Sequence, residues 1–266
     1  MPVDPGQARG WLTQTGAAIV DLVLPSACAG CAVEGEGQLC RGCRSGLAGL
    51  VPLPARPTPP PVGMPRCSAL GAYEGPLRGL LLAYKERGAH RLAAPLGDHL
   101  ARAVASRILS AGSSYSMPVV VVPVPATAAA VRERHGDHMV RLARRTVRAL
   151  RRSGWPAVCG HCLAALPKAD SSHLSAEERA VAATSAFRVR AGRIRRVRAA
   201  ADAGALVIVV DDILTTGSTM AAVTTALQTA GVTVAGGATI AATRRRMASL
   251  DRVRIPHSCP DVGIST

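Results

Sequence analysis

The most constraining feature of this chain is the segment 207–219, which reads Val-Ile-Val-Val-Asp-Asp-Ile-Leu-Thr-Thr-Gly-Ser-Thr. Four consecutive β-branched apolar residues predict a strand that is covered on both faces, as strands are in a parallel sheet. The hydroxyl-rich turn that follows ends this strand, and residues 220–230 predict a helix. The segment therefore predicts a strand, turn and helix unit of an α/β fold.

The turn of this unit has the chemistry of a phosphate site. Backbone N–H groups and the positive end of a helix dipole favour an anion at the point where a helix begins. Gly217 lets the backbone approach a ligand closely, and hydroxyl groups add donors. Asp211 and Asp212 precede the turn, and their carboxylates can accept hydrogen bonds from sugar hydroxyls. A sugar phosphate is the predicted ligand of Thr215, Thr216, Gly217, Ser218 and Thr219. An ordinary turn with Asp capping is the alternative.

Two C-x-G-C pairs near the N-terminus form the second motif. Their members are Cys28, Cys31, Cys40 and Cys43. Two such turns can present four thiolates tetrahedrally to one Zn²⁺, and a glycine in each permits a tight knuckle. Two disulfides are the alternative, which requires an oxidising compartment.

The apolar run 17–24 does not read as an export signal. It is short, contains Asp21, has little positive charge ahead of it and is followed by Pro25, so a lipidated Cys28 is not favoured. No other stretch reaches the roughly twenty clean apolar residues that a membrane span needs. We therefore expect a cytoplasmic protein with a zinc module.

Proline usage predicts the domain organisation. A proline-rich linker over 51–64 separates an N-terminal zinc-ribbon-like module at 1–50 from an α/β domain at 65–266. Further strands are expected at 119–122, 157–166, 186–189 and 233–240. Helices are expected after Pro95, over 139–150, and in a segment that residues 73–77 open and that continues to Lys85. Strands that alternate with helices predict an open, largely parallel sheet with ligands beyond the carboxyl ends of its strands.

This order of motifs resembles the ComF family over nearly the whole chain. Segment 207–219 has the pattern of the phosphoribosyl pyrophosphate (PRPP) motif of type I phosphoribosyltransferases: four hydrophobic residues, two acids, two spacers and Thr-Thr-Gly-x-Thr. The other matching features are the four cysteines, Tyr84-Lys85, Val-Pro-Val-Pro at 122–125, the arginine-rich segment 132–138, Leu174 with Arg179, and Ala186-Phe187. The chain departs from the family at Arg134-His135-Gly136-Asp137, where the family has Arg-Gly-Phe-Asn, and at Ala182, where it has Asn.

The resemblance implies an open, mostly parallel twisted sheet of the type I phosphoribosyltransferase kind with a small N-terminal zinc module. It implies that Asp211 and Asp212 are catalytic and bind the ribose 2′ and 3′ hydroxyls of PRPP, while residues 215–219 hold the 5′-phosphate. Mg²⁺ would bridge the pyrophosphate and ribose oxygens, and residues 168–179 would form part of a flap. Within 122–127, the pyrophosphate loop would comprise Val124, Pro125, Ala126 and Thr127.

A formal charge of +15 raises the question of nucleic acid. On a helix over 139–152, one side carries six arginines and the other carries Met139, Leu142, Ala143, Thr146 and Leu150. The basic side can meet phosphates through charge, as can arginines at 188–198 and 244–246; it comprises Arg141, Arg144, Arg145, Arg148, Arg151 and Arg152. The alternative is the solvated surface of an arginine-biased protein, since only Lys85 and Lys168 are lysines and aromatic residues make up 2% of the chain.

Each of two smaller motifs allows both a structural and a functional interpretation. Cys159 and Cys162 are either packed thiols or half of a metal site completed by His257 or Cys259. His135 and His138 are either solvated or close to the pyrophosphate.

Two functions follow for the whole protein. One is phosphoribosyl transfer from PRPP with release of pyrophosphate, linked by the resemblance to competence and DNA uptake. The other is a non-catalytic PRPP sensor or scaffold in a DNA-uptake or replication-restart assembly, bound to single-stranded DNA or DNA-processing proteins.

Overall fold

The computed structural model describes residues 27–134, 136–167 and 186–243. The strands are β1 (Leu53–Ala55), β2 (Cys67–Ala72), β3 (Val119–Pro123), β4 (Ala157–Cys159), β5 (Leu163–Ala165), β6 (Phe187–Val189), β7 (Leu206–Leu214) and β8 (Gly236–Ala242). The helices are α2 (Arg41–Gly49), α3 (Gly75–Glu86), α4 (Ala93–Leu109), α5 (Ala128–Glu133), α6 (His138–Arg152), α8 (Ala191–Asp202) and α9 (Ser218–Thr229), with a 3₁₀ turn η1 (His90–Leu92). No helix in this described part is long and apolar enough to cross a membrane.

The main sheet confirms the expected α/β architecture. Its order is β1-β2-β8-β7-β3-β4, and every neighbouring pair is parallel except β1 with β2. A second, antiparallel pair joins β5 to β6. The strand predicted at 207–210 forms the first half of β7, which continues to Leu214 before the turn ends it.

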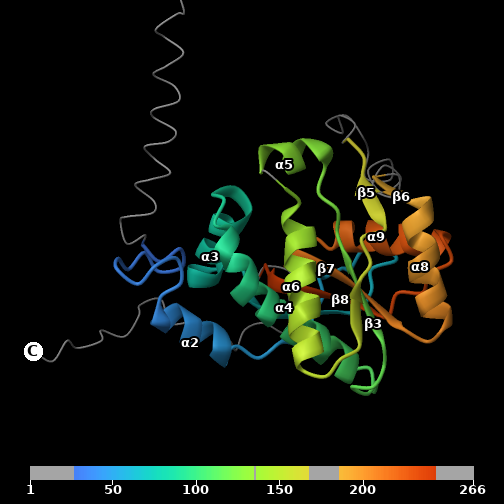
Figure 1. Ribbon diagram of the computed structural model, residues 1–266, viewed down its shortest axis with the longest axis horizontal. Coiled ribbons are helices and arrows are strands. Elements are labelled where there is room, and N and C mark those ends of the chain that lie inside the picture. The colour runs from blue at the N-terminus through green and yellow to red at the C-terminus, as the bar shows by residue number, and fades with distance from the viewer. Residues whose placement is uncertain (1–26, 135, 168–185, 244–266) are drawn as a thin grey trace, which may run out of the picture.

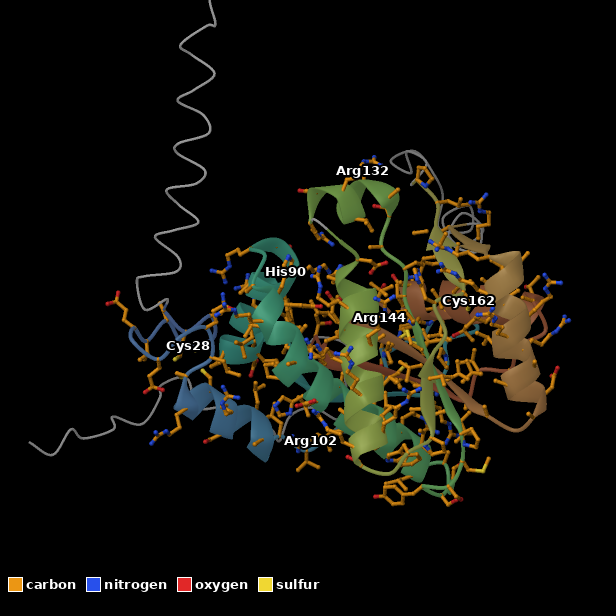
Figure 2. All side chains as sticks on the ribbon, in the orientation of Figure 1. Cys28, His90, Arg102, Arg132, Arg144 and Cys162 are labelled. Atoms are coloured by element: carbon orange, nitrogen blue, oxygen red, sulfur yellow. The ribbon has the colours of Figure 1, made fainter. Side chains whose placement is uncertain are left out.

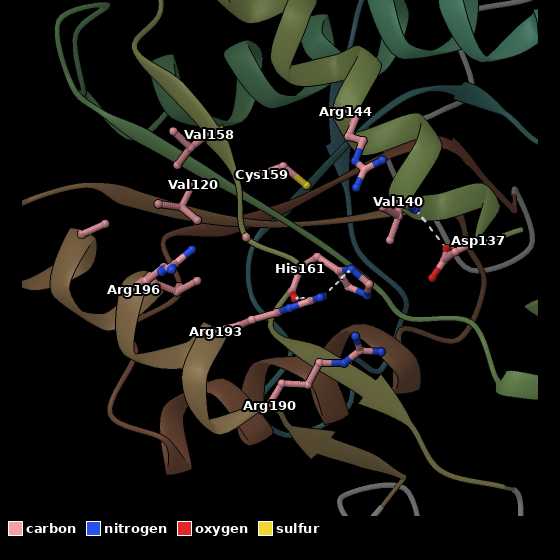
Figure 3. A pocket seen from close by; sticks show the side chains of 13 residues that line it. Val120, Asp137, Val140, Arg144, Val158, Cys159, His161, Arg190, Arg193 and Arg196 are labelled. Carbon is pink, nitrogen blue, oxygen red and sulfur yellow. Dashed lines mark hydrogen bonds between the residues drawn. The ribbon is translucent and has the colours of Figure 1, made fainter.

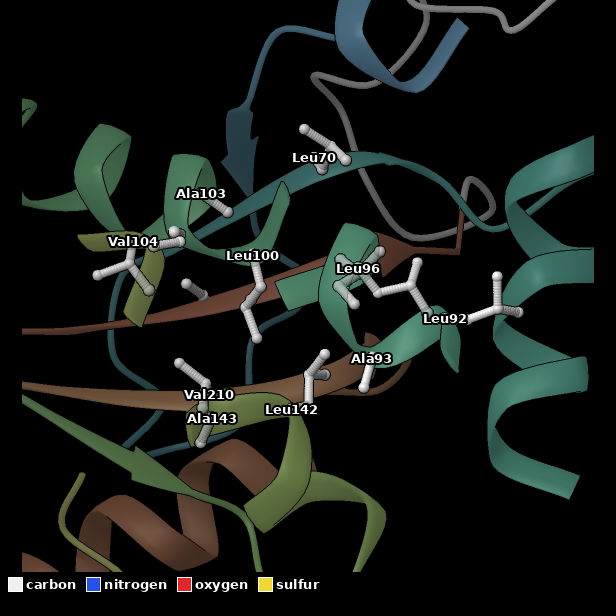
Figure 4. Close-up of a cluster of buried hydrophobic side chains, with 14 of the residues drawn as sticks. Leu70, Leu92, Ala93, Leu96, Leu100, Ala103, Val104, Leu142, Ala143 and Val210 are labelled. Carbon is white, nitrogen blue, oxygen red and sulfur yellow. The ribbon is translucent and has the colours of Figure 1, made fainter. Parts of the chain in front are cut away.

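Helices cover both faces of the sheet (Figure 1). On one face, α3, α4 and α6 pack against a row of β7 side chains that includes Ile208 and Val210. Figure 4 shows Leu96 and Leu100 of α4 close to Val210, with Leu142 and Ala143 of α6 beside them. On the other face, Val207 and Val209 belong to a second core with α8 and α9. Burial of both rows explains why this strand reads as a continuous apolar run.

The single strand predicted at 157–166 is wrong. The chain forms β4, leaves the main sheet at Gly160 and enters the second sheet as β5. A Cβ added at Gly160 would lie 2.7 Å from a methyl carbon of Val120, so the turn needs a residue without a side chain there. The last strand also begins later than expected, at Gly236 rather than at residue 233.

Two elements lacked a clear sequence signal. The β2 strand consists mostly of small residues, and the α8 helix buries only Ile194 and Val197 among its arginines. Both are held by tertiary contacts: β2 pairs with β8, and the two buried side chains of α8 join the core on the β7 face opposite α4.

The cysteine segment packs directly on the α/β domain. A Cβ added at Gly79 of α3 would lie 2.5 Å from the Ala29 carbonyl oxygen, so helix and knuckle are in close contact. Arg102 of α4 donates hydrogen bonds to the Leu47 carbonyl, at 3.1 Å, and to the Leu50 carbonyl at the end of α2. Within the proline-rich stretch, Leu53–Ala55 pairs with β2 as an edge strand.

Candidate active site and metal centre

Asp211 and Asp212 lie near the carboxyl end of β7, but their side chains leave opposite faces of the strand. Side chains alternate along a strand, so Asp212 continues the row of Ile208 and Val210, and Asp211 continues the other row. The pairing of β3 with β7 ends at Val210. Beyond it, the Asp211 carboxylate accepts a hydrogen bond from the Asp212 N–H at 2.9 Å. The sequence analysis expects both acids at the ribose hydroxyls, and the strand geometry directs their side chains to opposite faces of the sheet.

Asp212 is held in a network from three elements. Its side chain is 5% exposed, its Oδ2 lies 3.0 Å from Nζ of Lys85 at the end of α3, and His138 Nε2 at the start of α6 lies 3.6 Å away. The Tyr84 hydroxyl donates a hydrogen bond to the His138 carbonyl at 2.6 Å. Asp212 is therefore fixed in place by neighbouring side chains.

The two carboxyls have opposite electrostatic environments. Burial opposes ionisation of Asp212, but the His138 ring and the Lys85 ammonium outweigh it and hold the pKa of Asp212 well below its usual range. Burial raises the pKa of the Asp211 carboxyl well above its usual range, and the adjacent negative charge of Asp212 adds to this effect. Asp212 is thus an ionised, partnered group, while Asp211 would gain from a cation or from hydrogen-bond donors.

The predicted phosphate turn begins a helix of 12 residues, α9. Gly217 precedes it with φ +81°, a left-handed conformation that favours glycine. A Cβ at Gly217 would lie 2.5 Å from Met64 Sδ and 3.1 Å from Pro57 Cγ, so the proline-rich stretch supports the turn. Thr216 Oγ1 accepts a hydrogen bond from the Ser218 N–H at 3.4 Å and donates one to Ser218 Oγ at 3.0 Å. The exposed side chains of this turn are those of Thr215, Thr216, Ser218 and Thr219.

The loop after β3 lies beside the end of β7. The Val124 N–H donates to the Val210 carbonyl at 2.9 Å, which ties the loop to the residue before Asp211. Thr127 then caps α5, because its Oγ1 accepts a hydrogen bond from the Ala130 N–H at 3.3 Å. The predicted pyrophosphate loop 124–127 and the acidic end of β7 are therefore adjacent.

Lys85 and His138 are the site residues whose roles the sequence interpretation did not assign. Tyr84-Lys85 counted only as part of the resemblance, and His138 had a solvated alternative that its burial overturns. The rarity of lysine in this arginine-rich chain is a further sequence signal that could have drawn attention to Lys85. His135, the flap residues 168–179, Ala182, the arginines at 244–246, His257 and Cys259 lie outside the described residues.

The four N-terminal cysteines gather at one point. Their Sγ atoms all lie within 4.8 Å of one another, the one such group of potential metal ligands among the described residues. Cys40 N–H points at Cys28 Sγ, at 3.4 Å, and Cys43 N–H points at Cys40 Sγ, at 3.3 Å. Burial disfavours the Cys28 thiolate, but backbone N–H groups of Cys40, Cys31 and Gly30 lower its pKa to about 7. Four thiols so arranged could bind a metal such as zinc.

A second metal site involving Cys162 receives no support within the described part. Figure 2 shows Cys28 and Cys162 on opposite sides of the domain. Cys162 is fully buried in the core with α8 and α9, and burial raises its pKa to about 11. Cys162 is thus a packed thiol, while His257 and Cys259, which the metal alternative requires, lie outside the described residues.

The α6 helix has the expected basic outer face. The buried side includes Met139, Leu142, Ala143, Thr146 and Leu150. Part of the arginine face is engaged within the protein: Arg141 bonds to His90 Nδ1 at 2.8 Å, Arg151 to the Ala157 carbonyl at 2.7 Å, and Arg152 pairs with Asp98 at 2.6 Å. Arg144, Arg145 and Arg148 are exposed.

Comparison with known proteins adds one match. Residues 172–257 match the family model for the phosphoribosyl transferase domain. The described part of this match contains β6, α8, β7, α9 and β8, and so includes both acids and the turn before α9. A search of curated proteins found no match.

Proposed function

We propose that the protein is a phosphoribosyltransferase of the ComF kind, which binds PRPP and transfers its phosphoribosyl group with release of pyrophosphate. The observation that carries the proposal is the position of two acids at the carboxyl end of β7, directly before the glycine turn into α9. Ligands of open α/β sheets bind beyond this edge, and the loop after β3 lies at the same edge. The phosphoribosyl transferase match of residues 172–257 supports the same class of reaction.

The turn into α9 would hold the 5′-phosphate of PRPP. Its hydroxyls are exposed, and the left-handed backbone of Gly217 shapes the turn. The dipole of a 12-residue helix adds positive potential at this point. The loop 124–127 would hold the pyrophosphate, which is the group that leaves.

The Asp211 carboxylate would bind the ribose hydroxyls and Mg²⁺. The ion pairs among the described residues do not include Asp211, and its raised pKa marks a carboxyl whose ionised form needs compensation. Magnesium prefers carboxylate and phosphate oxygens, and when bound it would neutralise charge on the departing pyrophosphate. Binding of a cation or of hydroxyl donors would favour loss of the Asp211 proton.

Asp212 would act as a fixed negative charge below the sugar. As the bond between the anomeric carbon and the pyrophosphate oxygen breaks, positive charge develops on the ribose ring. An ionised carboxylate that needs no reorganisation stabilises this charge. Lys85 and His138 keep Asp212 ionised and oriented, and are therefore positioning residues.

The N-terminal residues 1–50 would form a structural zinc module, joined through 51–64 to the catalytic domain at 65–266. Four thiolates complete a structural zinc site and leave no position for substrate. Gly79 of α3 contacts the cysteine knuckle, and the same helix carries Lys85. Zinc would stabilise the helix that orients Asp212.

Release of pyrophosphate is the experiment that tests this function. The full-length protein is mixed with PRPP and Mg²⁺, and pyrophosphate is measured by a coupled assay with purine bases, pyrimidine bases and ammonia as acceptors. Turnover with one acceptor supports the transferase. Tight PRPP binding without pyrophosphate release from any acceptor would instead support the alternative, a PRPP sensor in a DNA-uptake assembly.

A further inference from the structure

A cavity of about 690 Å³ lies beside the edge strand β4, between α6 and α8 (Figure 3). This volume falls within the range of about 300–1,000 Å³ that is usual for small-molecule sites. Its lining includes apolar side chains of β3, β4 and α8, namely Val120, Val158 and Val197. None of the residues at the end of β7 or in the turn before α9 lines it. The cavity is thus separate from the proposed PRPP site.

The polar lining of this cavity is strongly positive. Arg144 comes from α6, while Arg193 and Arg196 come from α8, and Arg190 precedes α8. Asp137 is the single carboxylate of the lining, and its Oδ1 already accepts a hydrogen bond from the Val140 N–H at 3.0 Å. The ion pairs of the described chain include none of these four arginines. Within the described part of the chain, no ion pair compensates their charge.

His161 adds a hydrogen-bond donor that lacks an acceptor. Arg193 lies 3.1 Å from His161 Nδ1, and since a guanidinium can only donate, Nδ1 must accept. Burial and the surrounding arginines lower the pKa of His161, so the neutral ring carries its hydrogen on Nε2. That nitrogen is buried and has no hydrogen-bond partner among the described residues. Buried donors of this kind are normally satisfied, so this nitrogen has capacity for one acceptor.

We propose that this cavity binds a small molecule with two or more phosphates on an apolar or aromatic body, of the nucleoside di- or triphosphate class. One guanidinium group can donate two hydrogen bonds to a phosphate, and four such groups line this cavity. The valine side chains would contact the body of the ligand. Association of two copies through β4 is disfavoured, because it would bring two arginine sets together. The proposal does not depend on phosphoribosyl transfer.

Titration of the full-length protein with ATP by isothermal calorimetry tests this proposal, with and without saturating PRPP and Mg²⁺. The test variant is Arg190→Gln with Arg196→Gln. The matched control is Arg145→Gln with Arg148→Gln, which removes the same charge from exposed positions outside the cavity. We expect one ATP per chain, binding weakened at least about tenfold in the test variant and less than about twofold in the control. PRPP should not displace ATP.

The ring nitrogen signals of His161, assigned by comparison with His161→Gln, should shift when ATP is added. Tripolyphosphate should bind more weakly than ATP, because it lacks a body to contact the valines. Three results would overturn the proposal: no ATP binding, equal weakening in both variants, or binding of a dT oligonucleotide through Arg190 and Arg196 in the absence of ATP binding.

Discussion

Lys85 and Asp212 form an ion pair, at 3.0 Å, that joins the last turn of α3 to the end of β7. Asp212 is almost fully buried, whereas the Lys85 side chain keeps 27% of its surface exposed. The same helix touches the cysteine knuckle at Gly79. A single helix thus connects the candidate metal centre to the candidate active site.

Replacing Lys85 tests this ion pair. In Lys85→Met the buried Asp212 carboxylate loses its main cation, and the partial exposure of Lys85 limits the cost to about 2 kcal/mol of unfolding free energy, or a Tm lower by about 4–8 °C. PRPP affinity should fall as well. Lys85→Arg, which keeps the charge, should recover most of the stability in thermal denaturation. Equal Tm values for wild type and Lys85→Met would contradict the role given to the pair.

Asp211→Asn should stabilise the protein at neutral pH. The folded-state pKa of Asp211 is raised above its ordinary value of 3.8, so the wild type loses stability as pH rises from that value through the folded-state pKa. The amide variant does not titrate. Its Tm should therefore match the wild type near pH 4 and exceed it increasingly as the pH approaches 7. A lower Tm for Asp211→Asn at pH 7 would show that the carboxylate is not strained in the free protein.

Cys40→Ser should remove the metal and weaken the α3 contact. Metal analysis should find one zinc per wild-type chain and much less in the variant, with a clearly lower Tm, because metal binding contributes to folding. Cys159→Ser, outside the cluster, should keep its zinc. Two disulfides in protein purified under reducing conditions, or a metal-free wild type, would reject the zinc module.

Gly217→Ala should lower both the PRPP affinity and the stability of the protein. The left-handed backbone conformation costs an alanine about 1–2 kcal/mol. The added Cβ would also clash with Met64 and Pro57. Gly204→Ala is the control, since Gly204 has φ +90° with nothing within 4 Å of an added Cβ. Both variants should lose stability, yet only Gly217→Ala should lose PRPP affinity. Comparable PRPP affinity in the two variants would argue against a phosphate cradle at this turn.

The sequence predicted the local units well and their mutual contacts poorly. The β7 strand, the turn at Gly217 and the cysteine pairs could be read from short segments, because each depends on neighbouring residues. The ion pair of Lys85 with Asp212 could not, since it needs α3 and β7 to meet in space. The sequence analysis ends this strand at Val210, whereas β7 extends to Leu214 and so includes both acids, on opposite faces.

The arginines that line the cavity also come together only through the tertiary structure. Arg144 was read as part of an outer helix face, and the arginines of 188–198 as a surface cluster. Packing of α6 and α8 around β4 brings them to one cavity with His161. No spacing rule relates these elements, so only the tertiary structure reveals the site.

Calorimetric titration of PRPP with Mg²⁺ into wild type and Asp211→Asn tests the central claim most directly. Asp211→Asn should fold, which separates loss of binding from loss of structure. We expect one PRPP per wild-type chain and at least about tenfold weaker binding in the variant, because the variant loses a charged hydrogen-bond acceptor. Equal PRPP affinity in the two proteins, or no PRPP binding by the wild type, would contradict a PRPP site at the end of β7.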